Sequence, residues 1–411
     1  MRRLLRLYRR SFAGLSPEIW WLSLVMLINR SGMMVMPFFT LYLTEARGYS
    51  LADTGYIMIF FGLGAIAGSY IGGLLVDRLD PFRVQVGSLL LTGLGFFGLL
   101  QLSGFWSICA GLFVLTTIAD AFRPANYAAI AAYSRPETRT RSLSLVRLAV
   151  NLGISIGPAV GGALAQFAGY EWLFGVDGLT CLLAAGLLFW RLHPDRVPPP
   201  ATPPAGSGNA STSSVWADRP FLLFSLGMLL VVTAFFQIIY SWPVFYRTEL
   251  ALSELQIGLF FTFNGLLIAL IEMPVVFLTE KRWSNLGLTA TGAVGIAASM
   301  LVFNVGGFTV LVAGVSMFFI TISEIVNFPY SNAYTVARAG EGRTGAYLGL
   351  YTTTFAVAHL LAPPLGLPLA ESHGFAWVWW VNGGLGLLGA ALIYAVRRGA
   401  ASQRGIDFTV N

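Results

Sequence analysis

Twelve apolar segments, each about long enough to cross a bilayer, recur along this chain of 411 residues. A membrane-spanning helix needs roughly 20 apolar residues. Hydrophobic residues make up 56% of the sequence and charged residues only 11%, a balance that a water-soluble domain of this length does not sustain. We therefore predict an all-α integral membrane protein. The predicted spans are residues 18–43, 54–76, 84–103, 106–131, 142–166, 172–191, 220–246, 255–279, 285–305, 307–335, 345–369 and 375–396.

The basic residues outside these spans fall mostly in alternate loops. Five arginines lie within the first ten residues, and only Arg47 and Arg247 occupy the opposite set of loops. By the positive-inside rule, both termini are predicted to be cytoplasmic. A net charge of +6 suits loops that face anionic lipid, so no nucleic-acid partner is expected. The expected partners are the lipid bilayer, protons and a small-molecule substrate, and the protein is expected to be monomeric.

The two halves of the sequence resemble one another. Residues 157–161 (GPAVG) match residues 362–366 (APPLG), and residues 172–178 (WLFGVDG) match residues 377–383 (WVWWVNG), both at an offset of 205. Such internal repetition is typical of secondary transporters. Between the halves lies a stretch rich in Pro, Ser, Gly and Ala, which indicates a linker. We predict an N-terminal six-helix bundle at 1–192, a cytoplasmic linker at 193–219 and a C-terminal six-helix bundle at 220–411.

One segment of the fifth span favours close helix packing. Its small residues are Gly153, Gly157, Pro158, Gly161 and Gly162. Glycines four residues apart clear one face of a helix and let another backbone approach, and proline bends the helix. The second span repeats this spacing at Gly64, Gly68 and Gly72. We expect both sets to lie where helices of opposite halves pass closely.

The loop after the second span carries a family resemblance. It reads Gly73-Leu-Leu-Val-Asp-Arg-Leu-Asp-Pro-Phe-Arg83 and resembles the G-x-L-x-D-R-x-G-R-K/R signature of the major facilitator superfamily. The segment around Gly157 and Pro158 resembles the G-x-x-x-G-P-x-x-G-G signature of the 12-span drug:proton antiporters in that superfamily. The resemblance implies the major facilitator fold with two pseudo-symmetric six-helix bundles, alternating access, and a bacterial inner membrane. Asp80 and Pro81-Phe82 depart from the loop signature.

The same resemblance implies a gating role for this loop. The residues concerned are Gly73, Asp77, Arg78 and Arg83. A carboxylate at the end of the second span is suited to face the positive N-terminal end of another helix. In the family this implies a latch between Asp77 and the start of the eleventh span, Arg343-Thr-Gly345. The alternative is a solvated carboxylate that only fixes topology.

Ionisable groups inside the predicted spans are the main functional candidates, because each costs at least a few kcal/mol in lipid. The proton-coupling candidates are Glu324, Asp120 and Glu272. Glu324 is preferred, since an isolated carboxyl in an apolar cavity takes up a proton readily and competes with a cationic substrate. Asp120 and Arg123 lie three residues apart on one helix, so a purely structural ion pair is an equal alternative. Asp177 and Arg147 lie nearer span ends, where capping and snorkelling explain them.

By the same resemblance, spans one, four, seven and ten line a central cavity. The substrate-cavity candidates are Asn29, Arg30, Arg123, Gln237, Tyr240 and Asn327. Aromatic faces and amide groups suit a bulky amphipathic molecule or a cation held over a ring. For Arg30, the alternative to substrate binding is a clamp that holds the two halves together. His359, in the eleventh span, stays unassigned.

These observations predict proton-coupled export of small amphipathic or cationic compounds, such as drugs, by alternating access. The alternatives are a proton-coupled transporter of a sugar or organic acid, and a non-transporting scaffold or receptor. No enzyme activity, cofactor or metal is expected, since the three histidines form no H-E-x-x-H motif and no phosphate-binding loop occurs. The paired-glutamate signature expected of a peptide:proton symporter is also missing before Arg30.

Overall fold

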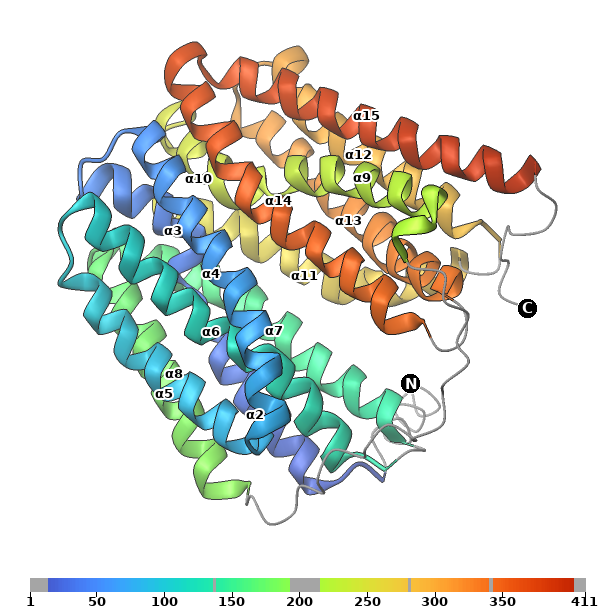
Figure 1. Ribbon diagram of the computed structural model, residues 1–411. Helices are drawn as coiled ribbons and strands as arrows, with labels where there is room; N and C mark the ends of the chain where they lie inside the picture. The colour runs from blue at the N-terminus through green and yellow to red at the C-terminus, as the bar shows by residue number, and fades with distance from the viewer. Residues whose placement is uncertain (1–13, 136–137, 193–214, 280–281, 340–342, 403–411) are drawn as a thin grey trace, which may run out of the picture. The chain divides into compact units, whose positions relative to one another are not determined.

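The computed structural model describes residues 14–135, 138–192, 215–279, 282–339 and 343–402, and these residues form helices with no strand (Figure 1). Within them, 12 helical stretches are long and apolar enough to cross a membrane, one at each predicted position. The prediction of an all-α protein with 12 spans is therefore confirmed. Residues 193–214 of the predicted linker and the arginine-rich first ten residues lie outside the described ranges.

The first and seventh spans are interrupted helices, and the other ten are continuous. The elements are, in chain order, α2 (Pro17–Ser31), α3 (Val35–Leu41), the π-helix η1 (Tyr42–Ala46), α4 (Leu51–Arg78), α5 (Pro81–Leu100), α6 (Phe105–Tyr133), α7 (Arg139–Phe167), α8 (Glu171–Arg191), the 3-10 helix η4 (Val215–Ala217), α9 (Arg219–Phe235), α10 (Gln237–Thr248), α11 (Glu254–Thr279), α12 (Asn285–Gly306), α13 (Val310–Ala339), α14 (Thr344–His373) and α15 (Phe375–Ser402).

Several helices begin at a residue whose side chain accepts a hydrogen bond from the first turn. Ser16 caps α2, Ser284 caps α12 and Asp218 caps α9. Asp80 caps α5 by accepting from the Phe82 N–H at 3.3 Å, and Pro81 is the first helical residue. Such caps satisfy backbone donors that a helix start leaves open, and proline at the first position loses no hydrogen bond. The residues that depart from the family loop signature are thus the start signal of α5.

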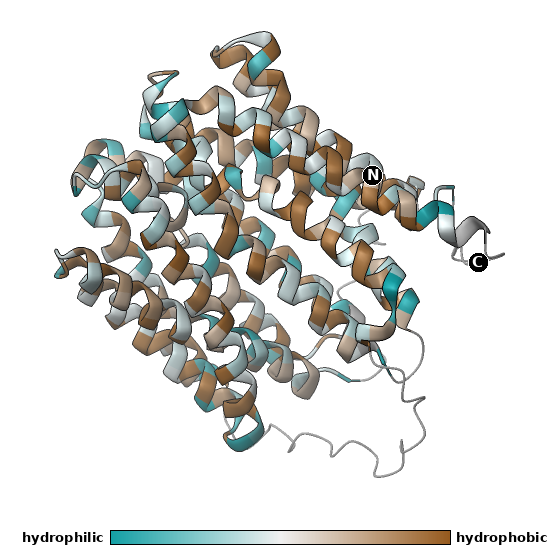
Figure 2. Ribbon diagram, turned by 45° about the horizontal axis from the view of Figure 1, so that its top comes forward, coloured by the Kyte–Doolittle hydropathy of each residue, from teal (hydrophilic) through white to brown (hydrophobic). Residues whose placement is uncertain are grey.

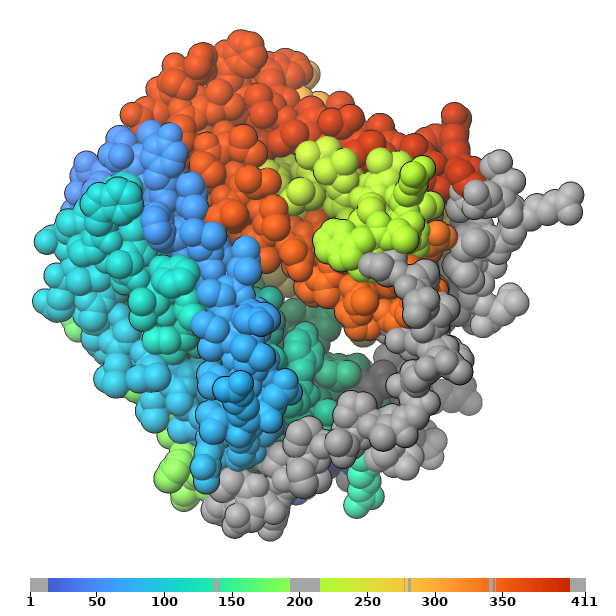
Figure 3. All heavy atoms as spheres, viewed as in Figure 1, coloured from blue at the N-terminus to red at the C-terminus, as the bar shows by residue number. Residues whose placement is uncertain are grey.

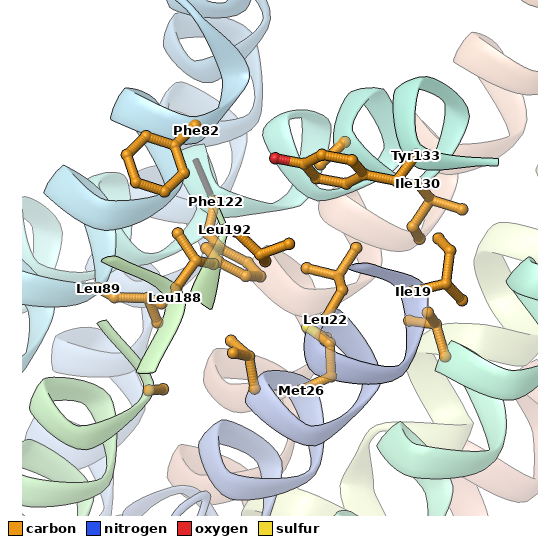
Figure 4. Close-up of a cluster of buried hydrophobic side chains, with 14 of the residues drawn as sticks. Ile19, Leu22, Met26, Phe82, Leu89, Phe122, Ile130, Tyr133, Leu188 and Leu192 are labelled. Carbon is orange, nitrogen blue, oxygen red and sulfur yellow. The ribbon is translucent and has the colours of Figure 1, made fainter. Parts of the chain in front are cut away.

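Contacts within the chain define two compact units. The first contains Met1–Phe39, Phe60–Pro203 and Ser253–Gly265. In it, α2 packs against α7 and α8, and α5 packs against α6 and α8. Apolar side chains from these helices meet in one core, to which Phe82, Leu188, Leu22 and Met26 all belong (Figure 4).

The second unit contains Thr40–Ile59, Pro204–Leu252 and Leu266–Asn411. In it, α9 packs against α14 and α15, and α12 packs against α13 and α15. Side chains of α9 and α14 adjoin on the face drawn in Figure 3. Each of these four pairs is equivalent, in chain order, to a pair in the first unit. The sequence repeat is therefore also a repeat of helix pairing.

The start of α4 and the start of α11 each pack away from the half of the sequence to which they belong. Thr40–Ile59 joins the unit that contains α9 to α15, and Ser253–Gly265 joins the unit that contains α5 to α8. Gly162, on α7, lies against the backbone of Glu254 and Leu255 at the start of α11. Gly55, on α4, lies 3.1 Å, measured from an ideal Cβ, from the Pro363 carbonyl oxygen of α14.

Many large apolar side chains point away from both cores. Tyr70, Trp106, Phe189 and Leu311 are each more than two-thirds exposed. Figure 2 shows hydrophobic residues along the outer sides of the helices as well as between them. In water, such continuous apolar surface favours aggregation, whereas lipid chains cover it without cost. The packing therefore agrees with a multipass membrane protein.

The glycines spaced four residues apart on the second and fifth spans pack against helices of their own half. An ideal Cβ at Gly153 meets the Arg30 Cβ at 2.7 Å, and Gly157 and Gly161 also lie against the first span. The glycines of α4, Gly64, Gly68 and Gly72, lie against α6. The expectation that both sets mark contacts between opposite halves is wrong. Two other residues of the fifth-span motif, Pro158 and Gly162, lie against α11.

Candidate functional site

The first unit brings together three of the charged residues predicted from the sequence. Arg123 donates to Asp120 Oδ1 from Nη2 at 2.8 Å, one turn apart on α6. The Asp120 side chain is 17% exposed and that of Arg123 62%, so the pair points from the protein interior towards open space. Arg30, on α2, lies within electrostatic range of both. The proposed ion pair thus exists, and a second guanidinium stands beside it.

Arg30 makes poor use of its hydrogen-bonding capacity. Its Nη1 lies 2.7 Å from the sulfur of Met33, which is a weak acceptor. Among the described residues, its buried Nε has no hydrogen-bond partner. Its neighbour Asn29 donates from Nδ2 to Cys181 Sγ on α8 at 3.4 Å, which is also a weak interaction. A buried guanidinium normally makes several hydrogen bonds, so Arg30 retains capacity for a ligand.

The first span breaks immediately after Arg30, and an acidic residue holds the break. α2 ends at Ser31 and α3 begins at Val35. The backbone N–H of Met34 donates to both carboxylate oxygens of Asp177, at 3.0 and 3.3 Å, and the N–H of Val35 donates to Oδ2 at 3.0 Å. Asp177 is 3% exposed. It therefore caps a helix of another span from within the unit, rather than a span end as the sequence suggested.

In the second unit, the predicted cavity residues of α10 face α14. Gln237 is fully buried, donates to the Ala362 carbonyl oxygen at 2.8 Å and accepts from Ser241 at 2.5 Å. The Tyr240 hydroxyl lies 2.8 Å from His359 Nδ1, and the His359 ring stacks on Phe236 with ring centroids 3.6 Å apart. The break in the seventh span, at Phe236, is thus built around an imidazole that the sequence left unassigned.

The remaining predicted residues of the second half lie on α13 and α11. Asn327 is fully buried on α13 and donates to the Thr289 carbonyl oxygen of α12 at 2.7 Å, so it joins two packed helices. Glu324, on the same helix, and Glu272, on α11, are partly buried. Asn327 therefore stabilises helix packing, whereas the two glutamates keep some access to their surroundings.

The predicted gating residues lie at the helix ends on either side of one short turn. Asp77 and Arg78 are exposed in the last turn of α4, and Arg83 is exposed in the first turn of α5. Gly73 lies one turn earlier on α4, with nothing within 4 Å of an ideal Cβ. All four side-chain positions are accessible from outside the first unit.

A pair of equivalent contacts ties the starts of α4 and α11 to helices of the other half. In the second unit, Glu371 near the end of α14 accepts from the Ala52 N–H at 2.5 Å. In the first unit, Gln166 near the end of α7 accepts from the Leu255 N–H at 3.4 Å. The two acceptors occupy the same position of the repeat, and so do the two donors.

Arg247, one of the two basic residues outside the predicted pattern, has a partner. Its Nε donates to Glu45 Oε1 at 2.7 Å within the second unit. Glu45 ends the first span and Arg247 ends the seventh, at equivalent positions of the repeat. Tyr170 and Glu254 form a further hydrogen bond of 3.0 Å in the first unit. The ends of these spans are thus joined by polar contacts rather than left to solvent.

At the opposite ends of the helices, Asp218 joins three spans. It caps α9, accepts from Arg338 Nε and Nη2 of α13 at 2.9 Å each, and accepts from the Tyr347 hydroxyl of α14 at 2.8 Å. Burial by itself raises the pKa of this carboxyl, but the hydrogen bonds from Arg338, Tyr347 and the Phe221 backbone outweigh it. The pKa of Asp218 therefore lies below its ordinary value.

The family model described as the Major Facilitator Superfamily matches residues 20–363. The chain belongs to the Major Facilitator Superfamily. This facilitator is 24% identical over 368 residues to the "Uncharacterized MFS-type transporter YttB" of Bacillus subtilis, which covers 85% of this chain and 87% of that protein. It is 22% identical over 371 residues to the "Multidrug resistance protein MdtH" of Aeromonas salmonicida, with 88% and 90% covered.

Solved structures show the same fold. A POT family transporter in complex with 5-aminolevulinic acid has a TM-score of 0.78 at 17% identity and covers 94% of this chain and 97% of its own. A bacterial homologue of the human lysosomal transporter Spinster has a TM-score of 0.74 at 14% identity, with 95% and 99% covered. The predicted family and fold class are therefore confirmed, and the protein is a membrane transporter of this superfamily.

Sequence reasoning missed three of the residues described here: Asp177, Asp218 and His359. One signal was available for Asp177, because it matches Asn382 in the repeat and the two residues differ only in charge. For Asp218 the sequence offers no such signal, because a carboxylate just before a helix with proline in its first turn indicates only an N-cap. Among the described residues, no group of three or more His, Cys, Asp and Glu side chains is arranged to hold a metal ion.

Proposed function

We propose that this facilitator exports small amphipathic or cationic compounds, such as drugs, in exchange for protons. The observation that carries the proposal is the Asp120–Arg123 pair within α6, with Arg30 of α2 beside it. Acidic and basic groups inside spans are expensive and mark proton or substrate pathways. The multidrug resistance names among its relatives support the same substrate class.

In this proposal Asp120 exchanges a proton for a cation. When ionised, it binds Arg123 or the positive group of a substrate; when protonated, it releases both. Proton and substrate then compete for one carboxylate, which is the simplest form of antiport. Each proton that enters down a membrane potential of 100 mV releases about 2.3 kcal/mol. Glu324 and Glu272 are proposed as further proton carriers in the second half.

The proposal places the protein in a bacterial inner membrane as a monomer, with both termini cytoplasmic. The halves at 1–192 and 220–411 move as six-helix bundles connected by the linker, and Asp77 with Arg78 and Arg83 gates the cytoplasmic side. The exposure of these side chains supports a role in contacts that form and break. No enzymatic activity is proposed.

A second candidate is transport of a small organic acid with protons. Two guanidinium groups, Arg30 and Arg123, accompany the Asp120 carboxylate in the first unit. The buried Arg30 Nε has no hydrogen-bond partner in the part of the chain that the structure describes. A substrate carboxylate satisfies such a guanidinium better than a cation does. This candidate predicts binding that depends on Arg30, whereas drug export depends on Asp120.

The test uses purified protein in liposomes that enclose a pH-sensitive dye. A cationic drug such as ethidium is added under an imposed proton gradient to wild type, Asp120→Asn and Glu324→Gln. We expect drug-driven proton movement in wild type and its loss in Asp120→Asn. Movement that persists in both variants excludes these residues as essential carriers.

Two additions separate the candidates. Glu171→Gln, an exposed position at the start of α8, serves as a matched loss of one carboxylate and is expected to behave as wild type. Addition of small organic acids in place of the drug tests the second candidate. Proton movement driven only by these acids, and abolished by Arg30→Gln, overturns drug export in favour of organic-acid transport.

A further inference from the structure

We propose that Asp177 is a further proton-binding residue of this transporter, and that its protonation loosens the break in the first span. The inference rests on the proton coupling proposed above, but it concerns a different helix and a different consequence. Asp120 exchanges its proton for substrate, whereas Asp177 controls the backbone that carries Arg30.

Asp177 contacts only backbone N–H groups of the first span, among the hydrogen bonds that its carboxylate accepts. Its carboxylate accepts three hydrogen bonds, all of them from the Met34 and Val35 backbone. It forms no ion pair with a described residue, although it is only 3% exposed. Burial favours the protonated form of this carboxyl, whereas the N–H donors favour the ionised form. A change in either the burial or the hydrogen bonds therefore changes how readily Asp177 binds a proton.

One face of α8 contacts the break in the first span along its whole length. Phe174 packs edge-to-face on Phe39 with centroids 6.0 Å apart. One turn later stands Asp177, and one further turn brings Thr180 against Gly32 in the gap between α2 and α3. Cys181 accepts from Asn29 before the gap. The break is therefore held from its start to its end by this face, and Asp177 supplies the only acidic group on it.

The second half of the repeat has an uncharged residue at the position of Asp177. Asn382 of α15 occupies the position of Asp177, is fully buried and donates to the Val378 carbonyl oxygen of its own helix at 2.9 Å. Its Oδ1 has no hydrogen-bond partner within the described ranges. The seventh span nevertheless breaks at the equivalent place, between α9 and α10. A break at this position thus forms without a charge, and the carboxylate of the first half adds a titratable group.

Few other charges face Asp177. On α8 the nearest titratable group is Cys181, and on α2 it is Arg30, which interacts electrostatically with Cys181. The charged residues of α5 and α7 are confined to the first nine residues of each helix, and α3 has none. The next charged residue along the first span is Glu45, in η1. Protonation of Asp177 is therefore not compensated by an ion pair.

The consequence of protonation follows from the same contacts. A neutral carboxyl is a weaker acceptor than a carboxylate, and its protonated oxygen becomes a donor where the carboxylate only accepted. The Met34 and Val35 N–H groups then lose much of their stabilisation. Since Arg30 lies in the last turn of α2, a looser break frees it to move relative to Asp120. Proton uptake at one helix thereby alters the charge balance at another.

Two measurements on the full-length protein in liposomes test this inference. Infrared difference spectra over a pH titration report the carbonyl stretch of a protonated carboxyl, and hydrogen exchange of residues 30–41 reports opening of the break. In wild type, we expect a titrating carboxyl band and, after correction for intrinsic exchange, opening that increases ten- to a hundredfold on protonation, on the order expected for losing a charge-assisted hydrogen bond. Asp177→Asn is expected to lose that band and to show pH-independent exchange.

Matched variants keep the outcome decisive. Asn382→Gln changes the equivalent amide and is expected to leave the band and the exchange of residues 30–41 unchanged. If Asp177→Asn does not fold, Asp177→Glu retains the acid and is expected to shift the titration midpoint of the band. An unchanged band in the Asp177 variant, or wild-type exchange without pH dependence, overturns the inference. Drug-driven proton movement measured on the same samples reports separately whether the proposed antiport holds.

Discussion

The two halves of this facilitator build the same helix pairs but join them with different chemistry at three equivalent places. At the start of the first helix, Ser16 donates to the Tyr133 carbonyl oxygen at 2.8 Å in one half, whereas Asp218 binds Arg338 in the other. At the far ends of the helices, Gln166 in one half corresponds to Glu371 in the other. Beside the breaks, Asp177 corresponds to Asn382.

The three equivalent positions share their place in the fold but differ in charge. In each case a polar side chain occurs at the same position of the repeat, yet in each case only one half carries the ionised form. The repeated fold therefore keeps a polar side chain at these positions but does not require a charge there. Where a charge is present, it adds strength or sensitivity to pH, and its effect is measurable against the neutral counterpart in the same molecule.

The largest effect on stability is expected at Gly153, where the first half leaves no room for a side chain but the second half has Ala358. Gly153→Val adds a Cβ and two methyl groups against Arg30 and the Ser31 backbone, which an ideal Cβ alone already meets at 2.7 and 2.9 Å. The equivalent residue in α14 is Ala358, which is fully buried. We expect Gly153→Val to destabilise the protein by about 3 kcal/mol or more, because neither helix backbone can move freely. Thermal unfolding in detergent measures it, with Ala358→Gly as the mild counterpart.

A smaller effect is expected at the caps of α2 and α9. Asp218→Asn removes a charge that accepts two hydrogen bonds from Arg338 and is expected to cost about 2 kcal/mol. Ser16→Ala removes a neutral cap and is expected to cost about 1 kcal/mol. Equal losses in the two variants, measured by denaturant titration of the purified protein, contradict the view that charge strengthens the second junction.

The same aspartate predicts a dependence on pH. Because the pKa of Asp218 is lowered in the folded protein, its stabilisation is complete above the ordinary value of about 3.9 and is lost as pH falls through the lower folded value. The melting temperature of wild type should therefore fall below about pH 4 more steeply than that of Asp218→Asn. Parallel curves for the two proteins through this range rule out the contribution of Asp218.

The smallest effect is expected at the exposed ends of α7 and α14. Glu371→Gln converts the second-half cap of Ala52 into the amide found at Gln166. Since both acceptors are exposed, we expect a change in unfolding free energy within about 0.5 kcal/mol, and one that disappears in high salt. A loss well above this value, or one independent of salt, shows that the charge of Glu371 carries a structural role.

Much of the fold was predictable because it depends on local patterns. The length and apolarity of each span are set by consecutive residues, and the repeat is visible as matched segments such as those that contain Asp177 and Asn382. Pairing of Asp120 with Arg123 was predictable for the same reason, since three residues separate them on one helix. The glycine motif predicted close approach, but not which helix approaches.

The sequence by itself determined the twelve helices, their order and their duplication. Only the tertiary structure decided that Asp177 holds the break after Ser31 and that Asp218 reaches Arg338. It also decided that the glycines spaced four residues apart on α4 and α7 pack within their own half: Gly64, Gly68, Gly72, Gly153, Gly157 and Gly161. The physical reason is the range of the interactions. Hydrophobic length and helical spacing act between near neighbours in the chain, whereas a carboxylate that binds backbone more than 140 residues away has its partner chosen by packing.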